Sequence, residues 1–213
     1  MEYNIEIFLS YTRSSNIYII LENKEALVVD AGLPEFASTV VTHIKDLKNV
    51  QRVHLVFTHC HYDHVFGYTV FRKSFKKVET YAHELDANDI KNATIKTYSV
   101  FFGAREGVPV DHLLKEGDSL SVGSLDVKVL HTPGHTEGSI TLLLDERAFV
   151  GDLIFNRSFG RYDLLSGNPK DLKKSILRLS KMEKLKVIYP GHGSIISSPR
   201  ENFEIVLSLL DNI

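Results

Sequence analysis

The sequence predicts an α/β layered fold, because short apolar runs typical of strands alternate with stretches of helical periodicity. Polar segments rich in His, Asp and Gly follow several of these runs directly, which is where chemistry usually lies in such folds. The chain has 213 residues, 43% of them hydrophobic, and shows no internal repeat or low-complexity linker. We therefore expect a single domain over residues 1–213.

The first third of the chain predicts two strands, a helix and a further strand. Residues 17–21 and 26–29 are β-rich runs separated by a short charged turn, which indicates a hairpin. Pro34 can occupy the first position of a helix, and apolar residues then recur at helical spacing. The apolar run 53–57 predicts a buried strand that ends at a cluster of histidines.

The rest of the chain continues this alternation after a stretch that is hard to interpret. Residues 79–118 mix helix-like pieces with loops and predict no clear element. Further strands are predicted at 124–130, 139–144, 148–150 and 187–189, and helices are predicted to begin at Asn168–Pro169 and Ser198–Pro199.

Charge and composition exclude several classes of function. The formal net charge is −2 with both signs interspersed, unlike the basic surface of a nucleic-acid binder. Cys60 is the single cysteine, so no intrachain disulfide can form and a reducing compartment is favoured. The first residues do not resemble a signal peptide, and no apolar run approaches the ~18 residues of a membrane span. We expect a cytoplasmic protein that acts on a small molecule, without nucleic acid or membrane; the oligomeric state is not predicted.

The segment FTHCHYDHVFG concentrates His59, His61, Asp63 and His64 within six positions. In an extended segment alternate side chains share a side, which would place His59, His61 and Asp63 together and leave His64 to face a second position. The same alternation turns Cys60 away, although a thiolate is a good zinc ligand. Imidazole and carboxylate suit zinc, iron or manganese rather than calcium. A histidine-rich surface loop that binds nothing is disfavoured by this density of ligands.

Three later segments offer further ligands, each directly after a predicted strand. HTPGHTEGS has a tight Pro-Gly turn before His135, GD places Asp152 at a strand end, and YPGHG presents His192. Four plus three candidates make seven, which suits two ions with three ligands each and a shared carboxylate, as in two-metal hydrolytic sites. The other histidines are expected to be ordinary surface or core residues: His43, His54, His83, His112 and, at a strand end, His131.

Together these segments resemble the metallo-β-lactamase superfamily. Asp30 after the second strand, THCHYDH, His135, Asp152 and His192 follow in the family order over residues 17–193. The resemblance implies a four-layer αββα sandwich with the site at one edge between the sheets. It implies that Asp30 is not a ligand and supports the metal loops through hydrogen bonds.

The resemblance also implies ligand sets and a reaction. The sets are His59, His61 and His135 for a first ion, Asp63, His64 and His192 for a second, and Asp152 as the bridge. Two zinc ions per chain are expected, with iron or manganese as alternatives, and they would lower the pKa of a water toward ~7. Asp63 and Asp152 would position the resulting hydroxide as catalytic residues.

The stretch FGRYDLLSGNP resembles the glyoxalase II-like and persulfide dioxygenase branches, both of which act on thiol-linked substrates. Arg161 in this stretch either binds a substrate carboxylate bidentately or forms a local brace with Asp163. Tyr98, Phe101 and Phe102 either belong to the core or line an acyl or lactone pocket. Because little of the chain follows PGHG, a short glyoxalase II-like form is implied.

Three reactions remain open at this point. Hydrolysis of a thioester such as S-acylglutathione at a dinuclear site is favoured, because a thiolate with a pKa of ~8.5 leaves without strong acid help. The alternatives are a mononuclear-iron persulfide dioxygenase and a lactonase. A binding module without activity is disfavoured, because all seven ligands are present.

Overall fold

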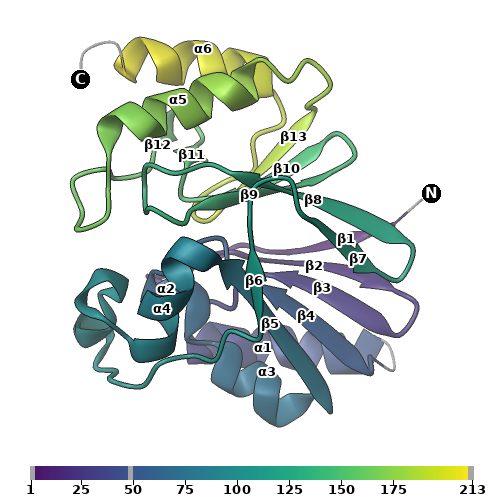
Figure 1. Ribbon diagram of the computed structural model, residues 1–213. Coiled ribbons are helices and arrows are strands. Elements are labelled where there is room, and N and C mark those ends of the chain that lie inside the picture. The colour runs from purple at the N-terminus through teal and green to yellow at the C-terminus, as the bar shows by residue number, and fades with distance from the viewer. Residues whose placement is uncertain (1–2, 48–49, 211–213) are drawn as a thin grey trace.

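The computed structural model describes residues 3–47 and 50–210 of the chain. Two β-sheets face each other across the middle of the molecule, and helices cover the outer face of each sheet (Figure 1). The four-layer αββα sandwich implied by the resemblance to the metallo-β-lactamase superfamily is therefore confirmed.

The first sheet has six strands in the order β1-β2-β3-β4-β5-β6. They are β1 (Ile5–Phe8), β2 (Ile17–Glu22), β3 (Glu25–Val29), β4 (Arg52–Val56), β5 (Lys77–His83) and β6 (His112–Leu114). β2 and β3 form the predicted antiparallel hairpin, whereas β3 to β6 run parallel. The parallel strands bring the segments that follow β3 and β4 to the same edge of the sheet.

The second sheet has five strands in the order β13-β10-β9-β8-β7. They are β7 (Ser119–Val122), β8 (Leu125–His131), β9 (Ile140–Leu144), β10 (Arg147–Gly151) and β13 (Val187–Pro190). A small hairpin of β11 (Ile154–Phe155) and β12 (Ser158–Phe159) follows β10. Because β10 and β13 are parallel, Asp152 and His192 leave the sheet at the same edge.

Helices pack on the outside of both sheets (Figure 1). α1 (Pro34–Leu47), α2 (Tyr62–Val65), α3 (Tyr68–Ser74) and α4 (Glu84–Asn92) cover the first sheet, and α5 (Pro169–Ser180) and α6 (Pro199–Leu210) the second. α5 begins as predicted, with the Asn168 side chain accepting from the backbone N–H groups of Lys170 and Asp171. Within the described residues, no helix combines the length and hydrophobicity that crossing a membrane requires.

The predicted strands differ from the observed ones by at most one residue at either end. Five of the elements that were not predicted lie between 77 and 118: β5, α4, β6 and the short 3-10 helices η1 (Ile95–Thr97) and η2 (Ser99–Phe102). α4 buries Asp86 and Asp89 beside Ala87 and Ile90, so acidic residues interrupt its apolar stripe. β1 and β7 were also missed, because each has only four residues, some of them exposed.

His83 connects the two sheets at the end of β5. Its Nδ1 accepts from the backbone N–H of Leu85 at 3.3 Å and so caps α4. Its ring stacks on that of His131, the last residue of β8, with 4.1 Å between centroids. Burial, followed by the charge of His131, lowers the pKa of His83 to about 4. The fold therefore favours the neutral ring.

We predict that the His83→Asn protein loses less stability than the wild type as the pH falls from 6.5 to 4. The pKa of His83 in the unfolded chain is ~6.5, so the unfolded state takes up the proton first and the stabilising neutral contact is lost through this window. Asparagine keeps an acceptor for the cap and does not titrate. Urea unfolding at pH 7 and pH 5, at equal metal concentration, measures the difference; His112→Asn is the control. The prediction is contradicted if the difference in free energy of unfolding between the wild type and His83→Asn is the same at pH 7 and pH 5.

Candidate metal centre

Loops from both sheets bring polar side chains to one edge of the sandwich. The candidate ligands form three overlapping groups, in each of which the ligand atoms lie within 4.8 Å of one another. The groups are His59, His61 and His135; His59, His64 and Asp152; and Asp63, His64 and His192. All seven residues predicted as ligands are thus close together, although they come from segments more than 120 residues apart.

Asp152 lies between the two sets of ligands. Its Oδ1 is 3.4 Å from Nε2 of His64, and its Oδ2 is 3.6 Å from Nε2 of His135 and 3.7 Å from Nε2 of His192. One carboxylate therefore approaches ligands of both predicted ions. This is the position that a bridging ligand requires.

The expectation that an extended segment places His59, His61 and Asp63 on one side is wrong at Asp63. His61 is extended, but α2 begins at Tyr62, and a helix turns successive side chains by about 100° instead of 180°. Asp63 therefore faces His192, with 3.1 Å between Oδ2 and Nε2, and does not join His59 and His61. Cys60 is buried and belongs to none of the ligand groups, as its place in the alternation predicted.

Asp30 orients two histidine rings through a buried hydrogen-bond network. Its carboxylate accepts from the Thr58 N–H at 2.8 Å, from the Thr58 hydroxyl at 2.9 Å and from Nδ1 of His64 at 2.8 Å. Because the Thr58 hydroxyl donates to Asp30, its oxygen can accept from Nδ1 of His59, 3.1 Å away. The neutral form of each ring then has its lone pair on Nε2, which is how second-layer partners orient metal-bound histidines.

A backbone carbonyl fixes a third ring. Nδ1 of His135 donates to the carbonyl of Arg161 at 2.7 Å, so the lone pair of His135 is on Nε2. That Nε2 lies 2.9 Å from Nδ1 of His61. Nε2 of His59 and Oδ1 of Asp152 are buried without a hydrogen-bond partner among the described residues. Buried polar atoms of this kind need an explanation, and a coordinated cation satisfies them.

The electrostatics of the cluster also favour a cation. Burial lowers the pKa of His61 to about 3, so that ring is neutral. Burial would lower the pKa of His64 as well, but Asp30, Asp152 and Asp63 outweigh it and raise that pKa well above its usual value. In the part of the chain that the structure describes, no Lys or Arg forms an ion pair with these carboxylates. A divalent ion would therefore compensate their buried charge, and the donor set fits one.

Asp86 joins the two ligand loops, and sequence reasoning did not identify it. Its Oδ2 accepts from the Cys60 N–H at 2.8 Å and the Thr136 hydroxyl at 2.7 Å, and its Oδ1 accepts from the Gly138 N–H at 2.8 Å. A Cβ on Gly138 would lie 2.5 Å from Cγ of Asp86, so only glycine allows this approach. An acidic residue on the buried face of α4 is the signal that could have revealed it.

A cleft of about 830 Å³ opens over the cluster and has aromatic walls. Tyr98, Phe101 and Phe102 line one side, so these rings belong to the cleft. The Arg161 guanidinium donates to both carboxylate oxygens of Asp163, at 2.9 and 2.8 Å, which is the local brace considered above. A direct contact of Arg161 with substrate stays a prediction.

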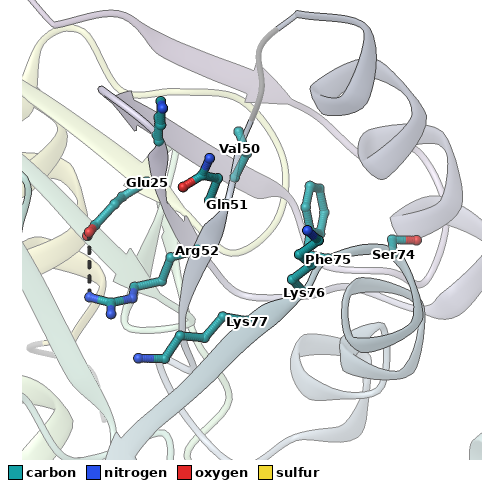
Figure 2. A pocket seen from close by; sticks show the side chains of 9 residues that line it. Glu25, Val50, Gln51, Arg52, Ser74, Phe75, Lys76 and Lys77 are labelled. Carbon is teal, nitrogen blue, oxygen red and sulfur yellow. Dashed lines mark ion pairs between the residues drawn. The ribbon is translucent and has the colours of Figure 1, made fainter.

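A second hollow, of about 730 Å³, lies at the opposite ends of the parallel strands (Figure 2). Arg52 and Lys77 line it, but Arg52 pairs with Glu25 and Glu79, and Lys77 pairs with Glu79. None of the ligand groups found in the described chain lies there. The chemistry therefore belongs to the cluster at the carboxyl ends of the strands.

Comparison with known proteins agrees with this geometry. The model of the metallo-beta-lactamase superfamily matches residues 11–192. The probable metallo-hydrolase MJ0888 of Methanocaldococcus jannaschii is 29% identical over 189 residues, which are 87% of this chain and 90% of that protein. The crystal structure of the BLEG-1 B3 metallo-beta-lactamase is similar with a TM-score of 0.78 and 26% identity, over 93% of this chain and 96% of that one. TTHA1623 in a di-iron-bound form has a TM-score of 0.74 and 26% identity, over 92% and 96%.

We predict that Asp86→Asn weakens zinc binding about tenfold, because second-layer partners of a metal site contribute at about this level. The amide of asparagine has one oxygen and one NH₂ group, so the NH₂ group would face N–H or O–H donors that now donate to a carboxylate oxygen. The hydrogen bonds from residue 86 to one of the two ligand loops would then be lost. Competition with a chromogenic chelator measures the affinity. Asp89→Asn, on the same helix, is the control, because the hydrogen bond and ion pair of the Asp89 carboxylate are with Thr94 and Lys96, outside the two ligand loops. Equal zinc affinity in the two variants would count against this role.

Proposed function

The chain belongs to the metallo-beta-lactamase superfamily and is a metallo-hydrolase of that family. We propose that it hydrolyses thioesters such as S-acylglutathione and that it uses two zinc ions to do so. The strongest support is the convergence of two ligand sets on Asp152. Support for two ions also comes from the similar TTHA1623, which has been crystallised in a di-iron-bound form. Iron or manganese would fit the same imidazole and carboxylate donors.

The side chains of the cluster have distinct roles in this proposal. Bound divalent cations would supply Lewis acidity, which lowers the pKa of water toward ~7 and polarises an acyl carbonyl. Burial would raise the pKa of Asp63, but His64 and His192 outweigh it and lower that pKa, so the carboxylate is ionised and acts only as an acceptor. Asp63 and Asp152 both line the cleft, where they can accept hydrogen bonds from the attacking water and align it.

The composition of the cleft favours a good leaving group. Among the described residues that line it there is no lysine, and the single hydroxyl is the phenol of Tyr98, a weak acid whose oxygen accepts from the backbone N–H of Leu165 at 3.0 Å. A strong general acid is therefore not in place beside the ligands. A thiolate, with a parent pKa of ~8.5, leaves without one, whereas the amine of an amide does not. We also propose that the substrate is a small molecule, because the candidate reacting groups lie in a cleft.

We expect the purified protein to contain two metal ions per chain and to hydrolyse S-lactoylglutathione. Removing the metal with a chelator should abolish the release of thiol, and adding zinc should restore it, because the protein groups supply no other Lewis acid. Plasma mass spectrometry and a thiol-trapping dye are the two measurements. One iron per chain with oxygen uptake on glutathione persulfide and no thiol release would contradict the hydrolase and indicate the dioxygenase. Turnover of lactones alone would indicate the lactonase.

We further predict that His61→Ala and Asp152→Ala each lower kcat at least ~1,000-fold, because losing the Lewis acid removes several kcal/mol of transition-state stabilisation. The fold should persist, since both side chains lie outside the three apolar clusters. Circular dichroism and metal content accompany the kinetics. Asp126→Ala, an exposed position on β8, is the control. Full activity in a metal-depleted variant would exclude the proposed mechanism.

A further inference from the structure

Two arginines line the cleft over the metal cluster, and they differ in their partners. The guanidinium of Arg161 is neutralised by Asp163 through two hydrogen bonds, at 2.9 and 2.8 Å. Arg13, in the loop between β1 and β2, is exposed. Among the side chains that the structure describes, none forms an ion pair or hydrogen bond with its guanidinium. Arg13 therefore brings an uncompensated positive charge to the cleft.

The backbone beside Arg13 is tied to the metal loops. The N–H of Ser15 donates to the carbonyl of Asp63 at 3.1 Å, and the N–H of Asn16 donates to that of Gly191 at 2.6 Å. The Asn16 side chain also donates to the carbonyl of Pro190 at 3.0 Å. These bonds hold the loop at the end of the cleft where Asp63 and His192 lie. The Arg13 side chain is exposed, and the backbone beside it is fixed next to the ligands.

The walls of the cleft are apolar and partly open to solvent. Phe101 is 75% exposed and stacks on Tyr98 with 5.9 Å between centroids. The ring of Tyr98 lies 5.4 Å from that of His61, and the ring of Phe155 lies 6.3 Å from that of His192. Aromatic side chains thus flank the cluster on both sides. An exposed apolar surface next to convergent polar groups is typical of a ligand site.

We propose that Arg13 binds a carboxylate of the substrate, and that the substrate is an acyl compound with an apolar body and an anionic end. The inference rests on the proposed hydrolysis and narrows its substrate class. The reacting carbonyl would lie at the cluster, the apolar body would contact Tyr98 and Phe101, and the anion would meet the planar fork of the guanidinium. The carboxylate belongs either to the acyl part or to the thiol part, and the two sources can be separated by experiment.

Binding of a probe that does not react tests Arg13 without turnover. Calorimetry on the metal-loaded protein compares 4-phenylbutane-1-sulfonate with the neutral 4-phenylbutyl methyl sulfone; a sulfonate is a weak metal ligand. We expect the ratio of the sulfonate Kd to the sulfone Kd to be about tenfold higher in Arg13→Ala than in the wild type. This is the effect expected when one hydrogen bond to a charged group is lost. Arg200→Ala is the control, because Arg200 is 96% exposed on α6 and does not line the cleft. An unchanged ratio in Arg13→Ala overturns the proposal.

Kinetics with three thioesters then identify the source of the carboxylate. The substrates are S-butanoyl-3-mercaptopropionate, S-ethyl monothiosuccinate and the neutral S-ethyl butanethioate. For one of the two anionic substrates, the ratio of its kcat/KM to that of the neutral thioester should be about tenfold lower in Arg13→Ala than in the wild type. The substrate for which this happens shows whether the carboxylate belongs to the thiol part or to the acyl part. Equal preferences in both proteins count against the proposal. If the wild type hydrolyses none of the three while the sulfonate ratio still changes, the anion site stands and the proposed thioester hydrolysis is excluded.

Discussion

The central constraint in this protein is that several imidazole rings must point their lone pairs into one small volume while each ring keeps a fixed orientation. Each ring needs an acceptor for its other nitrogen, and the acceptor must be held by the fold. Asp30 meets this need for His64 directly and for His59 through the Thr58 hydroxyl. Because Asp30 is 2% exposed and has a left-handed φ of 59°, the turn after β3 aims its carboxylate inward. The site therefore depends on a residue that belongs to none of the three ligand groups.

The two sheets make this convergence possible at little cost in chain length. Parallel pairing in each sheet places successive strand ends at one edge, so short loops suffice to deliver the ligands. Asp86 completes the arrangement, because it connects the loop after β4 with the turn that carries His135. Two buried carboxylates thus brace the ligand loops. Asp30 accepts from a backbone N–H, a hydroxyl and an imidazole, and Asp86 accepts from two backbone N–H groups and a hydroxyl. The precision of the site comes from these braces as well as from the sheets.

The sequence predicted most of the fold and all seven convergent side chains, for identifiable physical reasons. The strands that lie in the middle of each sheet are mostly apolar, and several of the ligands follow such a strand closely, so pattern and position coincide. Asp86 escaped prediction because one acid on a helix looks like any solvent-facing residue until the helix is placed. The helical turn at Tyr62 was missed because four residues show no periodicity, although it decides that Asp63 faces His192. The uncompensated charge of Arg13 follows from the absence of an acidic partner among the described residues, which no local pattern encodes.

The turn after β12 has a double role with a consequence for how such a protein can diversify. Residue 161 serves the metal centre with its carbonyl, which accepts from His135, and faces the cleft with its side chain. Every amino acid carries that carbonyl, so the side chain at this position can be exchanged during evolution without withdrawing the acceptor from the histidine. Descendants of such a sequence can therefore explore new substrates while the inherited metal chemistry is retained.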